Sequence, residues 1–296
     1  ELARKDINFD NAKSGIIFDD PAPWPDPIDG GDLLDAIVVA ARRYLVLPPG
    51  VAEAIALWIL HAHAVNAFYH TPRLAVTAPE RGCGKSVVLD FLALLTPRCL
   101  QTENVSTAVV FRLTEDYQPT LLCDEVDTYL KSRDELVGIL NAGHKRGAKA
   151  FRCNGDDNQV KSFSAFAPVA TAGIGKLPPT LGDRSIPVRM RRASNNERPV
   201  PLRADRAHHE RNLMRQCIRW KLDNFDALMN ADPSVPDWMF NRVADNWRPL
   251  FAIADAAGGE WPERARSIAA VLSNETVSEE TYRLMALKDL ETLFRE

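Results

Sequence analysis

The stretch from residue 73 to residue 86 constrains the fold of this chain more than any other. It reads Arg-Leu-Ala-Val-Thr-Ala-Pro-Glu-Arg-Gly-Cys-Gly-Lys-Ser. The apolar run at residues 74–76 predicts a strand, and an apolar pattern with helical spacing begins after Ser86. A strand that turns into a helix N-terminus forms a phosphate cradle, because backbone N–H groups and the helix dipole face the anion. The sequence therefore predicts an α/β protein with a phosphate-binding loop.

The predicted loop follows the pattern G-x-x-x-x-G-K-[ST], in which the Lys contacts the terminal phosphates and the hydroxyl binds Mg²⁺. Pro79 stands at the first glycine position, so the match is imperfect and needs support from a second motif. The residues expected to bind ATP here are Pro79, Glu80, Arg81, Gly82, Cys83, Gly84, Lys85, Ser86 and Val87.

A second motif supplies that support. The apolar run Thr120-Leu121-Leu122-Cys123 predicts a strand, and Asp124-Glu125 follows it directly. We expect Asp124 to share Mg²⁺ with Ser86, and Glu125 to polarise the water that attacks the nucleotide. The two motifs together predict ATP hydrolysis. The alternative is an exposed turn followed by an acidic helix cap.

Two further residues are candidates for the catalytic machinery. Thr171, at the end of a predicted strand over residues 166–171, is expected to sense the γ-phosphate or to position the water. Arg184, on a turn before a predicted strand over residues 186–190, is expected to be an arginine finger for a neighbouring subunit. The alternative for Arg184 is a salt bridge to Asp183 or another acid.

The part of the chain from residue 206 onward has helical periodicity, broken by prolines and a Gly-Gly pair, and predicts a small helical domain. Arg242, near the start of one of its helices, is the expected lid arginine that contacts the nucleotide phosphates. Arg248 is the competing candidate.

A β-hairpin is predicted between the two catalytic regions. Residues 149–153 and 160–163 are its arms, and Asn154-Gly155 is a strong turn signal. Lys149, Arg152 and Lys161 are expected to give the hairpin a basic side that contacts DNA. A solvated surface hairpin is the equally weighted alternative. Arginines concentrated between residues 189 and 221 form a second basic region, which is either a solvated face, a nucleic-acid path or a subunit contact.

Composition limits where the protein works and what it binds. The net charge of −4 over 296 residues provides no overall positive field, so any nucleic-acid contact must come from a local patch. Five scattered cysteines fit a reducing cytoplasm, and no membrane-length apolar run occurs. His61 and His63 are two residues apart on a predicted helix and point away from each other, so we expect one partly buried and one surface histidine rather than a metal site.

The predicted organisation has three parts. Residues 1–30 form an extended, proline-rich lead-in, residues 31–200 an ATPase core, and residues 201–296 a helical lid. The first residue is Glu, and the last predicted helix, over residues 281–296, has no stop signal. We therefore expect this sequence to be a piece of a larger protein.

Short motifs are spread along most of the chain. They lie at residues 24–27 (Trp-Pro-Asp-Pro), 56–58, 79–86, 119–125, 140–144 (Leu-Asn-Ala-Gly-His), 175–178, 183–186 (Asp-Arg-Ser-Ile) and 245–250 (Asp-Asn-Trp-Arg-Pro-Leu). Together they resemble a domain-of-unknown-function family found in phage, prophage and mobile-element proteins, often beside primase-type modules. The resemblance covers about residues 20–295, and the joint set is more specific than a lone phosphate loop.

The resemblance implies a P-loop ATPase of AAA+ type, with a three-layer core and a C-terminal helical lid. It implies that Lys85 and Ser86 bind phosphate and Mg²⁺, that Asp124 and Glu125 serve the metal and the water, and that Arg184 acts in trans. A homo-oligomeric ring, such as a hexamer, follows from that arrangement. Pro79 matches the family's own Ser-Pro-Glu or Ala-Pro-Glu version of the loop.

The expected function is an ATP-hydrolysing motor, a helicase or translocase on single-stranded or forked DNA in phage or mobile-element replication, with the hairpin in the central channel. The alternative is a nucleotide-dependent switch or protein-remodelling ATPase, in phage defence or assembly, that does not move on DNA. A nucleotide-binding module without turnover is a third reading, which Asp124-Glu125 argues against.

Overall fold

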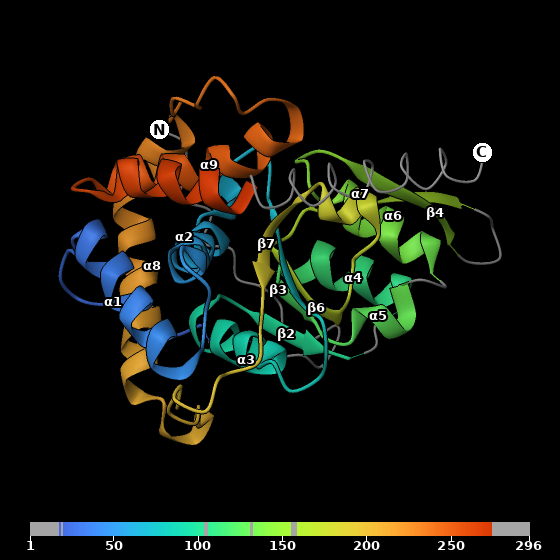
Figure 1. The fold of residues 1–296 in the computed structure, drawn as a ribbon. Helices are drawn as coiled ribbons and strands as arrows, with labels where there is room; N and C mark the ends of the chain where they lie inside the picture. Colours follow the sequence, from blue (N-terminus) through green and yellow to red (C-terminus); the bar gives the residue numbers. More distant parts are fainter. Residues whose placement is uncertain (1–17, 19, 104–105, 131–132, 155–158, 274–296) are drawn as a thin grey trace, which may run out of the picture.

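The structure, a computed structural model, describes residues 18, 20–103, 106–130, 133–154 and 159–273. A five-stranded sheet crosses the molecule, with helices on both of its faces (Figure 1). The strands are β1 (Arg73–Ala78), β2 (Cys99–Thr102), β3 (Thr120–Cys123), β6 (Val169–Ile174) and β7 (Ser185–Arg189). Their order is β2-β3-β6-β1-β7 and every pairing is parallel. The predicted α/β class is confirmed.

The sheet separates two apolar cores. One lies under α1 (Gly30–Tyr44), α2 (Val51–His63), α3 (Lys85–Leu95), α8 (His208–Met229) and α9 (Asn241–Ala257). The other lies under α4 (Thr107–Tyr117), α5 (Val126–Tyr129), α6 (Asp134–Ala142) and α7 (Pro179–Gly182). In β3, Leu122 belongs to the first core, whereas Leu121 and Cys123 belong to the second, as strand alternation requires.

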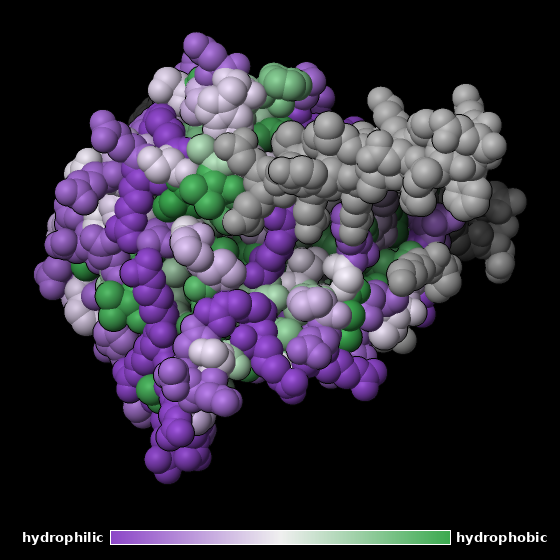
Figure 2. All heavy atoms as spheres, viewed as in Figure 1, coloured by the Kyte–Doolittle hydropathy of each residue, from purple (hydrophilic) through white to green (hydrophobic). Residues whose placement is uncertain are grey.

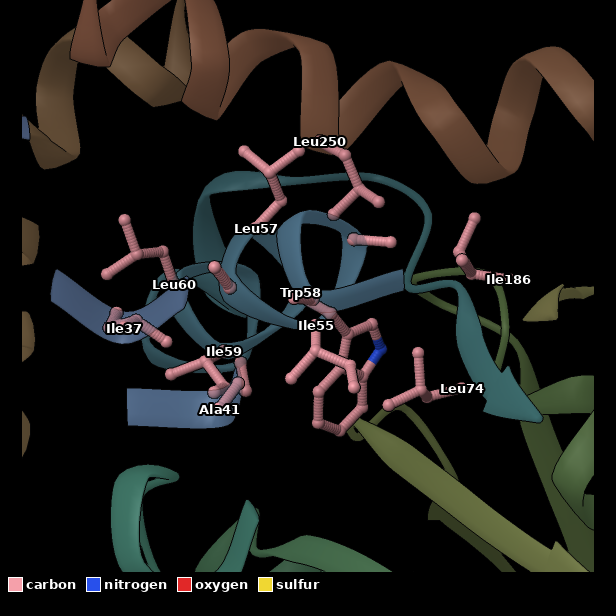
Figure 3. Packing of buried hydrophobic residues seen from close by; sticks show 14 of the residues in the cluster. Ile37, Ala41, Ile55, Leu57, Trp58, Ile59, Leu60, Leu74, Ile186 and Leu250 are labelled. Carbon is pink, nitrogen blue, oxygen red and sulfur yellow. The ribbon is translucent and has the colours of Figure 1, made fainter. Parts of the chain in front are cut away.

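The helix α2 is the centre of the first core. Almost all of its residues are buried, and it is apolar on every side, which is the pattern of a helix enclosed by others. Figure 3 shows Leu57 against Leu250 of α9, and Trp58 between α2 and the residues Leu74 and Ile186 of the sheet. The Trp58 indole N–H donates to the Pro72 carbonyl over 2.9 Å, so the helix is tied to the start of β1.

The C-terminal helices share a core with the N-terminal ones. The helices α8 and α9, and the helical residues 261–273, pack with α1 and α2 around Trp220, Trp247 and Trp261. Trp238 is 43% exposed and does not belong to this core. The boundary at residue 200 stays a prediction, and the predicted helix at 281–296 lies outside the described residues. On the face drawn in Figure 2, hydrophilic side chains predominate and apolar ones form small separate areas.

The predicted hairpin is present as β4 (Lys149–Asn154) and β5 (Gln159–Ser164), and the turn at residues 155–158 lies outside the described part of the chain. Positions 152 and 161 are paired and share a face. Position 149 is three residues from position 152, so it belongs to the other face. The single basic side predicted from Lys149, Arg152 and Lys161 is therefore wrong for Lys149. Within the described residues, no helix is long and apolar enough to cross a membrane.

Candidate functional site

The carboxyl edge of the sheet brings the two predicted motifs together. Parallel strands end at a common edge, and open α/β sheets bind ligands outside the carboxyl ends of their strands. The strand β6 lies between β1 and β3 and pairs with both, so the loops after these three strands are neighbours. The Gly175 N–H donates to the Ala78 carbonyl over 2.9 Å, which links the end of β6 to the start of the predicted phosphate loop.

The loop has the backbone of an anion cradle. Gly82 and Gly84 have φ angles of 77° and 80°, in the left-handed region that glycine adopts without strain. The helix α3 begins at Lys85, so its unpaired N–H groups face the loop. The Lys85 Nζ donates to the Glu80 carbonyl over 3.3 Å, which folds this side chain back across the loop. The arrangement suits the binding of a phosphate group.

Ser86 and Asp124 meet across the sheet edge. The Ser86 hydroxyl donates to Asp124 Oδ2 over 2.7 Å, and the Glu125 N–H donates to Asp124 Oδ1 over 2.8 Å. Asp124 is 8% exposed. A hydroxyl and a carboxylate are the hard oxygen ligands that Mg²⁺ takes when it is also bound by a nucleotide. The described residues contain no cluster of three or more His, Cys, Asp or Glu suited to a metal.

Glu125 has an unusual backbone. Its φ of 50° is left-handed, which is uncommon for a residue with a side chain and is found at active sites where the surroundings enforce it. The helix α5 starts directly after it, and Asp127 Oδ1 accepts from the Ile174 N–H over 2.8 Å. These contacts fix Glu125 at the carboxyl edge with its side chain exposed to solvent.

Thr171 does not lie where the sequence predicts. The strand β6 continues three residues further, to Ile174, because its apolar run extends through Ala172 and Gly173. Thr171 is the third residue of the strand and fully buried, and its hydroxyl lacks a hydrogen-bond partner among the described residues. The prediction that it ends the strand is wrong, and its role as a sensor stays a prediction.

Arg192 is a residue that the sequence analysis missed. It follows β7, which is the other neighbour of β1, and its Nη1 lies 3.8 Å from Glu80 Oε1. A Cβ atom built on Gly82 would lie 3.4 Å from Arg192 Nη2, so this guanidinium lies directly against the loop. The adjacent Arg191 is instead bound by Glu197. The available signal was an arginine three residues after the last strand, but Arg189 and Arg191 carry the same signal in the sequence.

Arg184 and Arg242 lie at the opposite edge. Arg184 precedes β7, and the register pairs Ser185 with Arg73 at the start of β1. Five residues of parallel strand separate the two edges by about 17 Å. Arg242 Nη1 lies 3.1 Å from Asp183 Oδ2, at the same edge as Arg184. Arg242 thus lies at the edge opposite the loop in this structure, and its expected contact with the nucleotide phosphates stays a prediction. Arg248 pairs with Asp232.

Three histidines, His61, His63 and His144, make buried or partly buried polar contacts within the fold. His61 Nε2 lies 2.9 Å from Thr71 Oγ1, and the partly buried His63 donates from Nε2 to the Leu95 carbonyl over 2.7 Å, so the expectation of a surface histidine is wrong. Burial lowers the pKa of His61 to about 3 and that of His63 to about 4. Burial, with a smaller contribution from the nearby Arg73, also lowers the pKa of His144 to about 3.

Comparison with known proteins gives partial matches. The model of a family described as "Protein of unknown function (DUF3631)" matches residues 189–296. An "Uncharacterized 28.9 kDa protein in xis 5'region" from Saccharopolyspora erythraea is 36% identical over 109 residues, which are 36% of this chain and 40% of the relative. The chain thus matches less than half the length of that relative. The family match includes Arg192, α8 and α9, and excludes the phosphate loop, Asp124 and Arg184.

The buried histidines predict a pH dependence of stability. Their folded pKa values lie below the unfolded value of about 6.5. Their stabilising contribution is therefore complete above pH 6.5 and is lost as the pH falls toward 4. In urea unfolding at pH 7, 6 and 5, the free energy of unfolding should fall less steeply with pH for the His63→Gln variant than for wild type. The difference in slope should be about 1.4 kcal/mol per pH unit below pH 6.5. Parallel curves for the two proteins would contradict this assignment.

Proposed function

We propose that this chain is a Mg²⁺-dependent ATPase of the P-loop class that binds ATP at residues 79–87. One observation carries the proposal: the 2.7 Å hydrogen bond between Ser86 and Asp124. Ser86 is the second residue of the helix after the loop, and Asp124 directly follows a strand two places away in the sheet. In phosphoryl-transfer sites of this class, the corresponding two groups bind the same magnesium ion beside the phosphates.

The proposed chemistry assigns a separate task to each side chain. Lys85 and the loop N–H groups hold the β- and γ-phosphates, and Glu125 accepts a proton from the attacking water. The water oxygen bonds to the γ-phosphorus as the bond from that phosphorus to the bridging oxygen breaks, which releases ADP and phosphate. Mg²⁺, when bound by Ser86 and Asp124, supplies positive charge to the phosphate oxygens.

The positions of the arginines support an oligomer. Arg192 provides a cation at the loop in the same subunit. Arg184 is about 17 Å of strand away from its own loop, so it serves only the nucleotide of an adjacent subunit. A closed ring would give every site such a neighbour. The assignment to the AAA+ class of ATPases, and the role of the C-terminal helices as a lid, are parts of this proposal.

The first prediction separates binding from turnover. Lys85→Ala should lose ATP binding, because the cation that contacts the terminal phosphates is removed. Glu125→Gln should bind ATP but hydrolyse it about 10²–10⁴-fold more slowly, because it keeps the shape and loses the base. Fluorescent-nucleotide titration and phosphate release measure the two effects, with the exposed Glu263→Gln as control. Normal hydrolysis by Glu125→Gln would refute the proposed site.

The second prediction tests action between subunits. Arg184→Ala should bind ATP normally and hydrolyse it about 10³–10⁵-fold more slowly, which is the usual contribution of an arginine finger. Mixing Arg184→Ala with Lys85→Ala protein should restore part of the activity, because each supplies what the other lacks at a shared interface. If the mixture stays as inactive as its components, Arg184 does not act in trans.

The substrate of the motor is proposed to be DNA. The hairpin of β4 and β5 precedes β6, the strand between the two site motifs, and its paired positions 152 and 161 carry arginine and lysine. The printed name of the relative, which refers to a xis region, supports a mobile-element setting. The alternative is a switch or remodelling ATPase that acts on a protein partner.

The third prediction distinguishes these two functions. Single-stranded DNA should raise the rate of ATP hydrolysis, and Arg152→Ala/Lys161→Ala should abolish that stimulation without changing the basal rate. Lys149→Ala, on the other face, is the matched control and should retain it. Measurements of phosphate release with and without DNA, at recorded oligomeric state, provide the test. If DNA leaves the rate of ATP hydrolysis by the wild type unchanged, the alternative of an ATPase that acts on a protein partner is favoured.

A further inference from the structure

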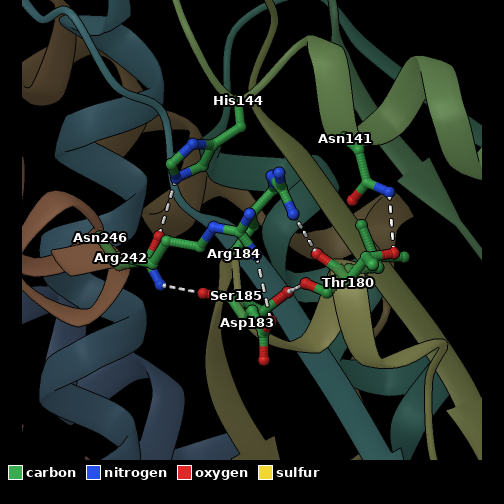
Figure 4. Close-up of polar contacts among 9 residues, drawn as sticks. Asn141, His144, Thr180, Asp183, Arg184, Ser185, Arg242 and Asn246 are labelled. Carbon is green, nitrogen blue, oxygen red and sulfur yellow. Dashed lines mark hydrogen bonds and ion pairs between the residues drawn. The ribbon is translucent and has the colours of Figure 1, made fainter.

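Three motif segments, of which only residues 183–186 have an assigned role, meet at the amino edge of the sheet. Residues 140–144 end α6, residues 183–186 form the turn into β7, and residues 245–250 lie in α9. Figure 4 shows their side chains converging on the turn that carries Arg184. They are far apart in the chain, so their convergence is a property of the fold and is independent of the phosphate loop.

Asn246 connects two of these segments. It is 3% exposed, its Nδ2 donates to the Asp183 carbonyl over 3.0 Å, and its Oδ1 lies 2.8 Å from His144 Nε2 (Figure 4). A buried amide with both ends bonded is costly to move, because any shift leaves polar groups unsatisfied. Asn246 therefore ties the backbone of the turn to α9 on one side and to the end of α6 on the other.

The end of α6 is itself immobilised. A Cβ atom built on Gly143 would lie 2.0 Å from the Ala165 carbonyl oxygen, so only glycine fits at this position. The fully buried Arg73 donates from Nη2 to the Leu140 carbonyl over 2.7 Å, and from Nη1 to the Ala167 carbonyl over 2.7 Å. His144 thus provides Asn246 with a rigid partner.

Arg242 controls the charge beside Arg184. Asp183 is the acid adjacent to Arg184, but its carboxylate pairs with Arg242 over 3.1 Å. Arg184 has no carboxylate partner among the described residues, and its Nη1 donates to the Thr180 carbonyl over 2.6 Å. Asn141 Nδ2 in turn donates to the Thr180 hydroxyl over 2.9 Å. The guanidinium is therefore held by a neutral carbonyl rather than by a carboxylate.

We infer that Asn246 and Arg242 of α9 are positioning residues for Arg184. Asn246 fixes the backbone of the turn that carries Arg184. Arg242 forms an ion pair with Asp183, the acid that would otherwise pair with Arg184. The inference rests on the proposed ATPase function. It implies that the finger of one subunit moves with that subunit's own helix α9, so the state of the helical layer is transmitted to the site of the neighbour.

Both substitutions should impair turnover and leave binding intact. Asn246→Ala should lower the hydrolysis rate at saturating ATP about 10²-fold, which is the loss typical of a catalytic group misplaced by about 1 Å. The dissociation constant for a fluorescent ATP analogue should stay within about twofold of wild type, because the loop is at the opposite edge. Arg242→Ala should likewise lower turnover without weakening binding. It should disturb folding less, because the Arg242 side chain is 47% exposed.

Adding Asp183→Asn to Arg242→Ala should restore much of the rate, because the freed acid is removed. Asn224→Ala is the control for Asn246→Ala, since Asn224 lies on α8 and, among the described residues, its side chain bonds only to the Trp220 carbonyl of its own helix. Its rate should match that of wild type. If Arg242→Ala instead weakens nucleotide binding at unchanged turnover, the inference is overturned and a nucleotide contact is indicated.

Mixing experiments exclude general damage to the fold. Asn246→Ala mixed with Lys85→Ala should regain activity, because the Lys85→Ala subunit supplies an intact finger to the intact nucleotide site. Asn246→Ala mixed with Arg184→Ala should gain nothing, because both are defective on the same side. Failure of the first mixture, or activity of Asn246→Ala within twofold of the control, overturns the inference. An inactive wild type, or a fully active Arg184→Ala variant, would refute the proposed function instead.

Discussion

The parallel pairing of β1 with β6 on one side and β7 on the other is the constraint on which the whole arrangement depends. It places the loops that follow these strands at one edge and the turns that precede them at the other. The predicted phosphate loop, the end of β6 and Arg192 lie at the first edge, while Arg73 and Arg184 lie at the second. A single chain thus carries different sets of charged and backbone groups at the two edges of its sheet.

The amino edge is held by polar contacts that tolerate little change. Arg73 is fully buried and bonded to carbonyl groups, and burial lowers its pKa to about 9. A buried guanidinium is costly unless all its donors are satisfied, so its three carbonyl partners, Leu140, Thr71 and Ala167, fix the start of β1 relative to α6. The turn with Arg184 is joined to the same strand, since the Arg73 N–H donates to the Arg184 carbonyl. Strand, helix and turn therefore behave as one rigid unit.

Local sequence patterns predicted the helices and strands better than they predicted which segments lie side by side in the fold. The strand over residues 120–123 has the predicted bounds, because its apolar run lies between Pro119 and Asp124. The strand β2 was missed, since it is short and lies at the sheet edge, only partly buried. The unexpected place of Arg242 and the omission of Arg192 have a common cause. The order of strands, which decides which arginine lies beside the loop, is set by packing between distant segments and leaves no periodic signal.

The enclosed helix α2 has a consequence for the order in which the chain is made. It is apolar on every side, yet part of its cover, α8 and α9, lies more than a hundred residues later in the sequence. At about 5–20 residues per second, the ribosome exposes this helix for on the order of ten seconds or more before α9 exists. Nascent chains of this protein therefore expose an aggregation-prone apolar helix early in synthesis. Its production should depend on chaperones that shield such segments, more than its mature surface would suggest.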